Sequence, residues 1–186
     1  MTTQPFQENY LQNIKKLFRY YKSLGDKTFA QLDETQIFQL PENHSNSVAI
    51  IVKHIAGNML SRWTDFLNSD GEKSWRNREM EFENTFETKQ EVLDYWEKGW
   101  ACLFNAIDPL TIEDLDKIAY IRNEGHSVLE AINRQLAHYS YHVGQIVFLG
   151  KLWKGENWES LSIPKGQSKA FNQKKFSQEK QRKNFV

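Results

Sequence analysis

The sequence predicts an all-α protein, a four-helix bundle that forms one domain. Four segments repeat apolar residues at the three- and four-residue spacing of amphipathic helices. Two of these segments open with a capping box, and a long polar connection separates the second segment from the third. A chain of 186 residues is long enough for one domain with a full-sized core. Helices in this order, with one long crossover connection, are typical of a four-helix bundle.

The first two helices are predicted in the N-terminal third of the chain. Residues 6–23 carry the first apolar stripe, and Gly25 predicts its end. A polar loop with one proline follows. The second helix is predicted to begin after a serine cap, at Ser45 or Ser47, and to continue to about Asn68.

A polar stretch from Ser69 to Thr88 connects the second helix to the third. It is too long for a tight connection, but it contains aromatic residues, which predict that it packs across the bundle: Trp75, Phe82 and Phe86. The third helix is predicted to begin at Thr88, where the residues TKQE have the form of a capping box. It should end before Pro109, because the residue that precedes a proline is pushed out of helical geometry.

A short extended or hairpin element is predicted before the fourth helix, with a strand at residues 116–122 and a turn at residues 123–125. The residues SVLE, from Ser127, form a second capping box, and this helix should reach about Trp153 and end near Gly155. The bundle therefore spans residues 1–156. Residues 157–186 are predicted to be a C-terminal extension that is first extended, then basic and disordered.

Charge is distributed unevenly along a chain whose formal net charge is zero. After Asn157, seven lysine and arginine residues are opposed by two glutamates, so the tail carries +5 and the rest of the chain −5. A basic tail can contact nucleic acid or acidic lipid. A solvated terminus is the simpler interpretation. Because the body of the protein is acidic, we do not expect it to bind nucleic acid.

The single cysteine, Cys102, excludes an internal disulfide and gives no sign of secretion. It lies within an apolar helical segment, where we expect it to be a small buried side chain. The N-terminus lacks the basic and apolar regions of a signal peptide, and no apolar run approaches the roughly 20 residues that span a bilayer. We therefore expect a cytoplasmic protein that does not enter membranes.

Three histidines are the candidate metal ligands. His138 and His142 are four residues apart in the fourth helix, so they project from one helix face. Together with Gln135 and Gln145 they form a polar stripe beside the apolar face of that helix. His54 lies at the corresponding edge of the second helix. Either part alone is weak support for a metal site, but two such helices packed side by side would bring the three imidazoles together.

Three imidazoles and one open position are the pattern of a catalytic metal site, whereas a structural site normally has four protein ligands. Imidazole suits Zn²⁺, Ni²⁺, Cu²⁺ and Fe²⁺, so the ligands do not identify the ion; we expect Zn²⁺ or Ni²⁺. The fourth ligand could be water, Asn58 or a carboxylate from the long connection.

Other polar residues near the three histidines have two interpretations. Gln135, Gln145 and Tyr141 could orient the imidazoles, or they could be ordinary polar residues of a bundle. His44 lies in a polar loop and His126 lies next to a helix cap, and we expect both to have structural or surface roles.

Two segments resemble the DinB-like (DinB/YfiT) superfamily of small bacterial bundle proteins: SVAIIVKHIAGN at residues 47–58 and NRQLAHYSYHVGQIV at residues 133–147. The likeness extends from the first helix to about Trp153. The residues SIPKG at 162–166 resemble an uncharacterised branch. The resemblance implies a four-helix bundle with an unusual order of helix directions, a homodimer, and a metal held by His54, His138 and His142.

The resemblance also suggests a reaction. Characterised relatives include transferases and isomerases that use low-molecular-weight thiols such as bacillithiol or mycothiol. We therefore expect a metal-dependent enzyme, a thiol S-transferase that acts on small electrophiles and whose metal activates an external thiol. Its catalytic residues beyond the ligands are unknown, and Cys102 is not proposed as the nucleophile.

Two alternatives remain open at this stage. A metal-dependent hydrolase would use water at the same site, but it would need a general base, and the sequence identifies none. A non-catalytic, metal-binding dimeric bundle would need no base at all.

Overall fold

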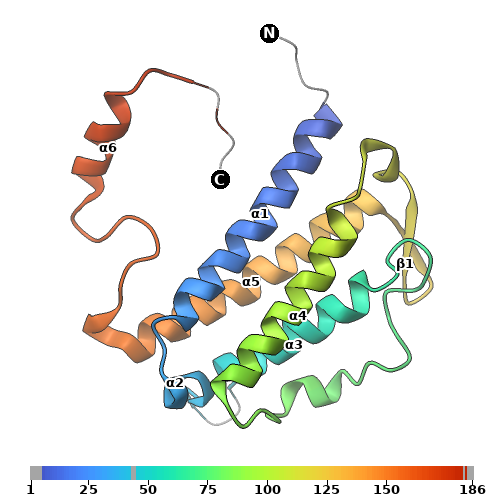
Figure 1. The fold of residues 1–186 in the computed structure, drawn as a ribbon, viewed down its shortest axis with the longest axis horizontal. Helices are drawn as coiled ribbons and strands as arrows, with labels where there is room; N and C mark the ends of the chain where they lie inside the picture. Colours follow the sequence, from blue (N-terminus) through green and yellow to red (C-terminus); the bar gives the residue numbers. More distant parts are fainter. Residues whose placement is uncertain (1–5, 43–44, 182, 184–186) are drawn as a thin grey trace.

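Four long helices make up most of this computed structural model, which describes residues 6–42, 45–181 and 183 (Figure 1). They are α1 (Phe6–Phe29), α3 (Val48–Trp63), α4 (Lys89–Ile107) and α5 (Val128–Lys154). The sheet found in the described part of the chain has two short strands, β1 (Ile118–Ile121) and β2 (Glu124–Ser127). The all-α class predicted from the sequence is therefore confirmed.

Short helical segments lie between and after the long helices. Three of them are 3₁₀ turns: η1 (Glu79–Phe82), η2 (Ile112–Asp114) and η3 (Gly155–Asn157). The other two are short α-helices, α2 (Glu34–Phe38) and α6 (Ser168–Phe176). We did not predict α2 or α6.

The long helices pack as two parallel pairs that run in opposite directions (Figure 1). In the α1–α5 pair, the Tyr10 hydroxyl near the start of α1 donates to Asn133 Oδ1 near the start of α5, at 2.7 Å. In the α3–α4 pair, a Cβ atom added at Gly99 would lie 2.8 Å from Ala56 Cα, so glycine allows these two backbones to approach. Because α3 and α4 run the same way, residues 64–88 must travel the length of the bundle to connect them.

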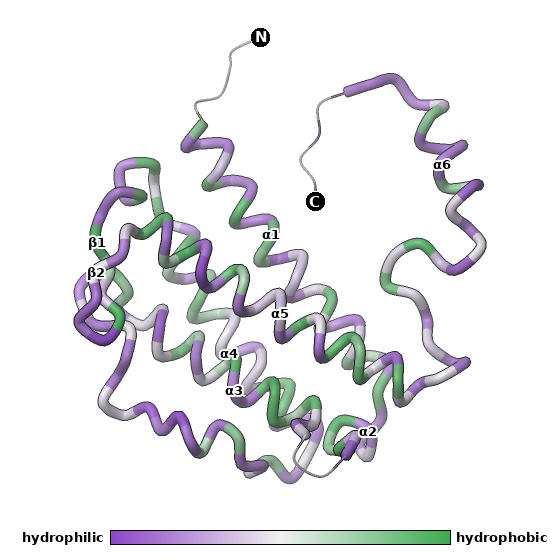
Figure 2. Tube along the Cα trace, turned by 180° about the vertical axis from the view of Figure 1, so that it is seen from behind, coloured by the Kyte–Doolittle hydropathy of each residue, from purple (hydrophilic) through white to green (hydrophobic). Residues whose placement is uncertain are grey.

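Aromatic side chains from all four long helices meet in the core. Phe18 of α1 contacts Trp63 of α3 and Trp100 of α4, with ring centroids 6.3 Å and 6.5 Å apart. Tyr139 of α5 lies 6.1 Å from Trp100. Edge-to-face aromatic pairs contribute beyond their burial, so this cluster ties the four helices together. Figure 2 shows how apolar residues recur along these helices, whereas α6 is mostly hydrophilic.

Three predicted helix starts are confirmed by their caps. The side chain of Ser47 accepts from the backbone amide of Ile50, and so caps α3. Thr88 opens α4 and Ser127 opens α5, each with both bonds of a capping box. These bonds satisfy backbone amides that the first helical turn leaves free.

Two predicted helix ends are wrong. The first helix does not end at Gly25 but continues to Phe29. A Cβ atom at Gly25 would collide with the ring of Trp96, so this glycine serves helix packing and not helix termination. The second helix ends at Trp63 and not near Asn68, because the backbone at Asp65 turns to a positive φ of 48°.

The connection between α3 and α4 is ordered and is held partly by the β1–β2 hairpin. The carboxylate of Asp70 accepts the backbone amides of Arg122 and Asn123 at the hairpin tip, both at 2.8 Å. These two tip residues have positive φ values of 57° and 63°. The polar stretch was predicted to pack across the bundle, which agrees with this arrangement; its contact with the hairpin was not predicted.

The C-terminal extension is fixed to the bundle at its beginning. The side-chain amide of Gln31 accepts from the amide of Glu159 at 2.8 Å and donates to its carbonyl at 3.1 Å. Beyond this point α6 stands away from the bundle in Figure 1. We expected residues 161–168 to be extended and the last dozen to be disordered; residues 168–176 are helical, and residues 182 and 184–186 lie outside the described residues.

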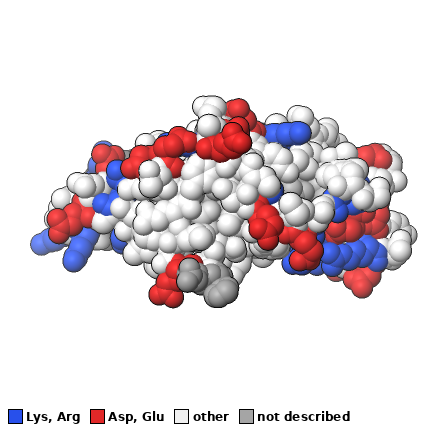
Figure 3. Space-filling model, turned by 90° about the horizontal axis from the view of Figure 1, so that it is seen from below, with Lys and Arg blue, Asp and Glu red and all other residues white. Residues whose placement is uncertain are grey.

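Charged side chains on the face in Figure 3 lie mostly toward its two ends and its edges, and the middle of that face is largely uncharged. Among the described helices, none is both long and apolar enough to cross a membrane.

Candidate metal centre

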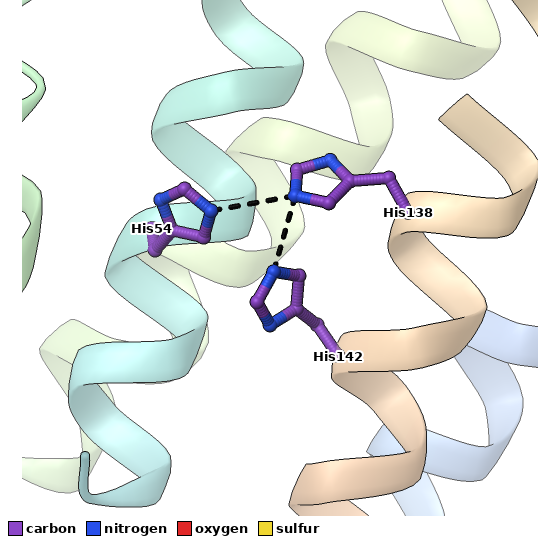
Figure 4. Close-up of side chains that lie close together, drawn as sticks. All are labelled: His54, His138 and His142. Atoms are coloured by element: carbon purple, nitrogen blue, oxygen red, sulfur yellow. Dashed lines mark hydrogen bonds between the residues drawn. The ribbon is translucent and has the colours of Figure 1, made fainter. Parts of the chain in front are cut away.

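The three predicted histidines lie together between α3 and α5 (Figure 4). His138 Nε2 is 3.4 Å from His54 Nε2 and 3.1 Å from His142 Nε2. One ring nitrogen from each histidine lies within 4.8 Å of the other two. His54 is buried, and His138 and His142 are partly buried.

A buried hydroxyl fixes the register of the two helices that carry the histidines. Tyr139, the residue after His138, donates its hydroxyl to Asn58 Oδ1 at 3.0 Å and accepts from Trp63 Nε1 at 3.0 Å. Asn58 is one turn after His54 on α3, so this bond sets which turn of α5 faces His54. Asn58 was a candidate fourth ligand, but the structure commits its oxygen to Tyr139.

A buried ion pair from the long connection contacts His54 on the side away from the other histidines. His54 Nδ1 donates to Glu81 Oε2 at 2.9 Å. Arg76 donates to the same carboxylate, from Nε to Oε1 at 2.7 Å and from Nη2 to Oε2 at 2.9 Å. Burial alone would raise the pKa of Glu81, but the bonds from His54 and Arg76 lower it below its ordinary value. A carboxylate on Nδ1 keeps the proton there and leaves the lone pair of Nε2 free.

Two further residues, Gly57 of α3 and Phe82 of η1, shape the contact between Glu81 and His54. A Cβ atom at Gly57 would lie 2.7 Å from Glu81 Oε1, so glycine allows the carboxylate to reach His54. Phe82, which follows Glu81 in the chain, stacks on the His54 ring with centroids 4.8 Å apart. The 3₁₀ turn η1 therefore places a carboxylate and an aromatic ring against one histidine.

Sequence reasoning missed this role of Glu81 and Arg76. A carboxylate from the long connection was a candidate fourth ligand, and the structure instead places it on the Nδ1 side of His54. The one local signal was the presence of aromatic residues such as Phe82 in an otherwise polar stretch.

His142 has a comparable partner on its own helix. His142 Nδ1 lies 2.8 Å from Gln145 Oε1, so the amide oxygen can hold the proton on Nδ1 and leave Nε2 free. The Tyr141 ring meets the His142 ring at an angle, with centroids 4.9 Å apart. Gln135 is buried, and its Oε1 has no hydrogen-bond partner in the described part of the protein.

The environment keeps the imidazoles of α5 neutral. Burial lowers the pKa of His138 to about 3, with further lowering by the positive charge that His142 and His54 would carry when protonated and by the nearby arginines. Burial also lowers the pKa of His142, partly offset by its bond to Gln145. Neutral imidazole is the form that binds metal ions.

The distances from His138 Nε2 to the other two imidazole nitrogens fit a shared divalent ion. Two imidazole nitrogens that bind one tetrahedral Zn²⁺ at about 2.0–2.1 Å are separated by about 3.3 Å, close to the observed 3.1 Å and 3.4 Å. Among the residues that the structure describes, no carboxylate or thiol joins the three histidines as a fourth candidate ligand. A bound ion would therefore keep a position for an exogenous molecule.

The remaining candidates lie elsewhere. Cys102 is half-buried on α4, with Sγ 3.5 Å from Thr64 Oγ1, and does not belong to the histidine cluster. His126 lies on β2, and its buried Nε2 has no partner among the described residues. The interpretation of His44 falls outside the described residues.

Comparison with known proteins gives one match. A family model described as "Protein of unknown function (DUF1572)" matches residues 5–167. No curated protein and no solved structure matches the chain. The matched region contains all four long helices and the three histidines, and it ends immediately before α6.

Proposed function

Because the chain belongs to the DUF1572 family, whose function is unknown, we propose a function from the geometry of its site. We propose that the protein is a metal-dependent enzyme that transfers a low-molecular-weight thiol to a small electrophile. The observation that carries this proposal is the convergence of three imidazoles, two of them with a pKa lowered by burial, with no fourth protein ligand among the described residues.

In this proposal the residues of the site bind and orient. His54, His138 and His142 hold Zn²⁺ or Ni²⁺ through Nε2, and Glu81 and Gln145 keep the protons of two of these rings on Nδ1. The ion supplies Lewis-acid chemistry, which lowers the pKa of a thiol or water that binds it.

The position of Glu81 favours a thiol over water as the nucleophile. A hydrolase needs a general base beside the attacking water. Glu81 lies on the Nδ1 side of His54, and Arg76 occupies both of its oxygens, so this carboxylate is not free to accept a proton from a molecule at the Nε2 side. An ion at this site would lower the pKa of a bound thiol, so that the thiol could release its proton to solvent before it attacks and would need no base from the protein.

We also infer a DinB/YfiT-type four-helix bundle and a cytoplasmic homodimer. Two observations support the bundle type: α3 and α4 run in the same direction, and the histidines come from the second and fourth long helices. Sedimentation of the full-length chain tests the dimer. A species near twice the chain mass of 22.0 kDa supports it, and a monomer at micromolar concentration contradicts it.

Elemental analysis tests the metal centre. The full-length protein, purified without a tag, is expected to hold about one Zn²⁺ or Ni²⁺ per chain or to take it up when the ion is added. The His138→Ala variant should lose the ion while its circular dichroism stays helical. His126→Ala is the matched control, because His126 lies outside the cluster and should leave the metal content unchanged.

A thiol-transfer assay then tests the reaction. Bacillithiol, mycothiol, glutathione and cysteine are each supplied with 1-chloro-2,4-dinitrobenzene, and thioether formation is followed by absorbance. Turnover that requires both a thiol and the intact His138 supports the proposal. Thiol-independent hydrolysis of 4-nitrophenyl acetate would favour a hydrolase, and a bound ion without either activity would favour a non-catalytic metal protein.

A further inference from the structure

A groove of about 470 Å³ lies beside the histidine cluster, between the start of α3 and the second half of α5. Its volume falls within the range of small-molecule sites, roughly 300–1,000 Å³. Ile51 of α3 and Gln145, Phe148 and Leu149 of α5 line it, together with Ser45 and Asn46, which precede α3.

The groove adjoins the metal centre through Gln145. This side chain lines the groove and also lies 2.8 Å from His142 Nδ1. On α3, Ile51 is three residues before His54, and on α5 Gln145 is three residues after His142. Three residues of helix rise by about 4.5 Å. A molecule in the groove can therefore extend to the face of the three imidazoles.

The chemistry of the lining excludes a strongly charged ligand. Eight described residues line the groove and none of them carries a charge. Two are aromatic and unusually exposed for their size, Tyr141 at 63% and Phe148 at 67%. They offer ring faces for apolar contact, while the amide and hydroxyl groups of Gln145, Asn46 and Ser45 offer hydrogen bonds. An anionic ligand finds no cationic partner here.

Gly144 gives a second and independent indication. It lies in the interior of α5 and lines the groove between Tyr141 and Phe148. Glycine inside a helix is less favourable than alanine, so it usually serves close packing. At Gly144, however, a Cβ atom would meet no atom within 4 Å. Helix packing does not require this glycine, and a side chain at this position would extend into the groove.

We infer that this groove binds the organic electrophile of the reaction, a small uncharged molecule with an aromatic or apolar body. The identification of this ligand as a substrate rests on the proposed function. The inference concerns the electrophile and not the thiol, because bacillithiol, glutathione and cysteine carry charged groups and mycothiol carries many hydroxyls, whereas the groove has an uncharged lining rich in aromatic and apolar side chains.

Two probes of the same shape test the inference with the full-length protein. N-phenyl-1-naphthylamine is uncharged, and 8-anilino-1-naphthalenesulfonate adds one sulfonate to the same ring system. We expect the uncharged probe to bind with increased fluorescence and the sulfonate to bind at least tenfold more weakly. Equal affinity for the two probes, or no binding of the uncharged one, overturns the inference.

A substitution that fills the groove makes the test specific. Gly144→Leu is expected to weaken binding of the uncharged probe at least tenfold while the melting temperature stays the same or rises, because leucine favours the helix. Ala137→Leu is the matched control: it adds bulk to an exposed position of the same helix, seven residues or about 10 Å away. Ala137→Leu should bind the probe as the unchanged protein does. Probe binding that survives Gly144→Leu contradicts the inference.

Two further measurements separate this inference from its alternatives. In His138→Ala the groove remains, so probe binding should persist even where the metal is lost. A failure of the metal centre therefore leaves the groove testable. Sedimentation of Gly144→Leu tests whether a second copy covers the groove instead. A change of oligomeric state in this variant assigns the groove to a subunit interface and overturns the inference.

Discussion

Glu81→Gln is the sharpest test of how the histidine centre is built. Glutamine has nearly the same shape as glutamate but no charge, so it weakens the partner of both His54 and Arg76 without emptying the space beside Gly57. Loss of such a partner behind a metal-binding histidine typically lowers metal affinity about 10- to 100-fold. That corresponds to about 1.4–2.8 kcal/mol of binding free energy.

The same change has a cost in folding that must be measured separately. Removing one partner of a buried ion pair typically costs about 3–5 kcal/mol. Arg76 keeps a second carboxylate, Glu72 Oε2 at 3.4 Å, and glutamine can still accept one bond. We therefore expect a loss of about 1–3 kcal/mol in the free energy of unfolding, measured by urea denaturation of the metal-free protein.

The assay is competition for Zn²⁺ against a chromophoric chelator, at a temperature where the variant is fully folded. Glu83→Gln is the matched control, because this glutamate lies two residues away with an exposed side chain. The ¹⁵N shifts of His54 in the metal-free protein report its tautomer, which Glu81 should hold at Nδ1–H. Wild-type Zn²⁺ affinity together with an unchanged tautomer in Glu81→Gln would refute the role assigned to this carboxylate.

Three further predictions follow from the same contacts. The metal-free protein should lose stability as the pH falls from about 6.5 toward 3. In that window His138 becomes protonated in the unfolded chain but stays neutral in the folded protein, where its pKa is about 3. The slope of melting temperature against pH should therefore be flatter in the His138→Gln variant. Gly57→Ala should displace Glu81 and weaken Zn²⁺ binding in the same direction as Glu81→Gln, whereas unchanged affinity would show that the carboxylate can move without consequence. Tyr139→Phe should cost about 1–3 kcal/mol in urea unfolding, because Trp63 Nε1 and Asn58 Oδ1 lose a buried partner; a loss below 0.5 kcal/mol (about the effect of a neutral surface change) would contradict it.

Local patterns in the sequence predicted the four long helices and the candidate metal ligands. The caps at Thr88 and Ser127 act on backbone amides within three residues, so they can be read directly from the order of residues. The pair His138 and His142 follows from helical spacing alone. His54 could be added because it lies at the edge of an apolar face that had to pack against another helix.

Only the tertiary structure decided what surrounds those ligands. Gly25 predicts a helix end by its local properties, but its packing against Trp96 keeps α1 continuous. Glu81 lies 27 residues from His54, in a connection without regular periodicity, so no local rule places it on Nδ1. Residues three or four apart on a helix have a fixed geometry, whereas an irregular segment takes its position from the surfaces on which it packs. The sequence therefore determined which imidazoles could meet, and the packed bundle decided the hydrogen-bond partners of His54 and His142, the lowered pKa values of His138 and His142, and the groove beside them.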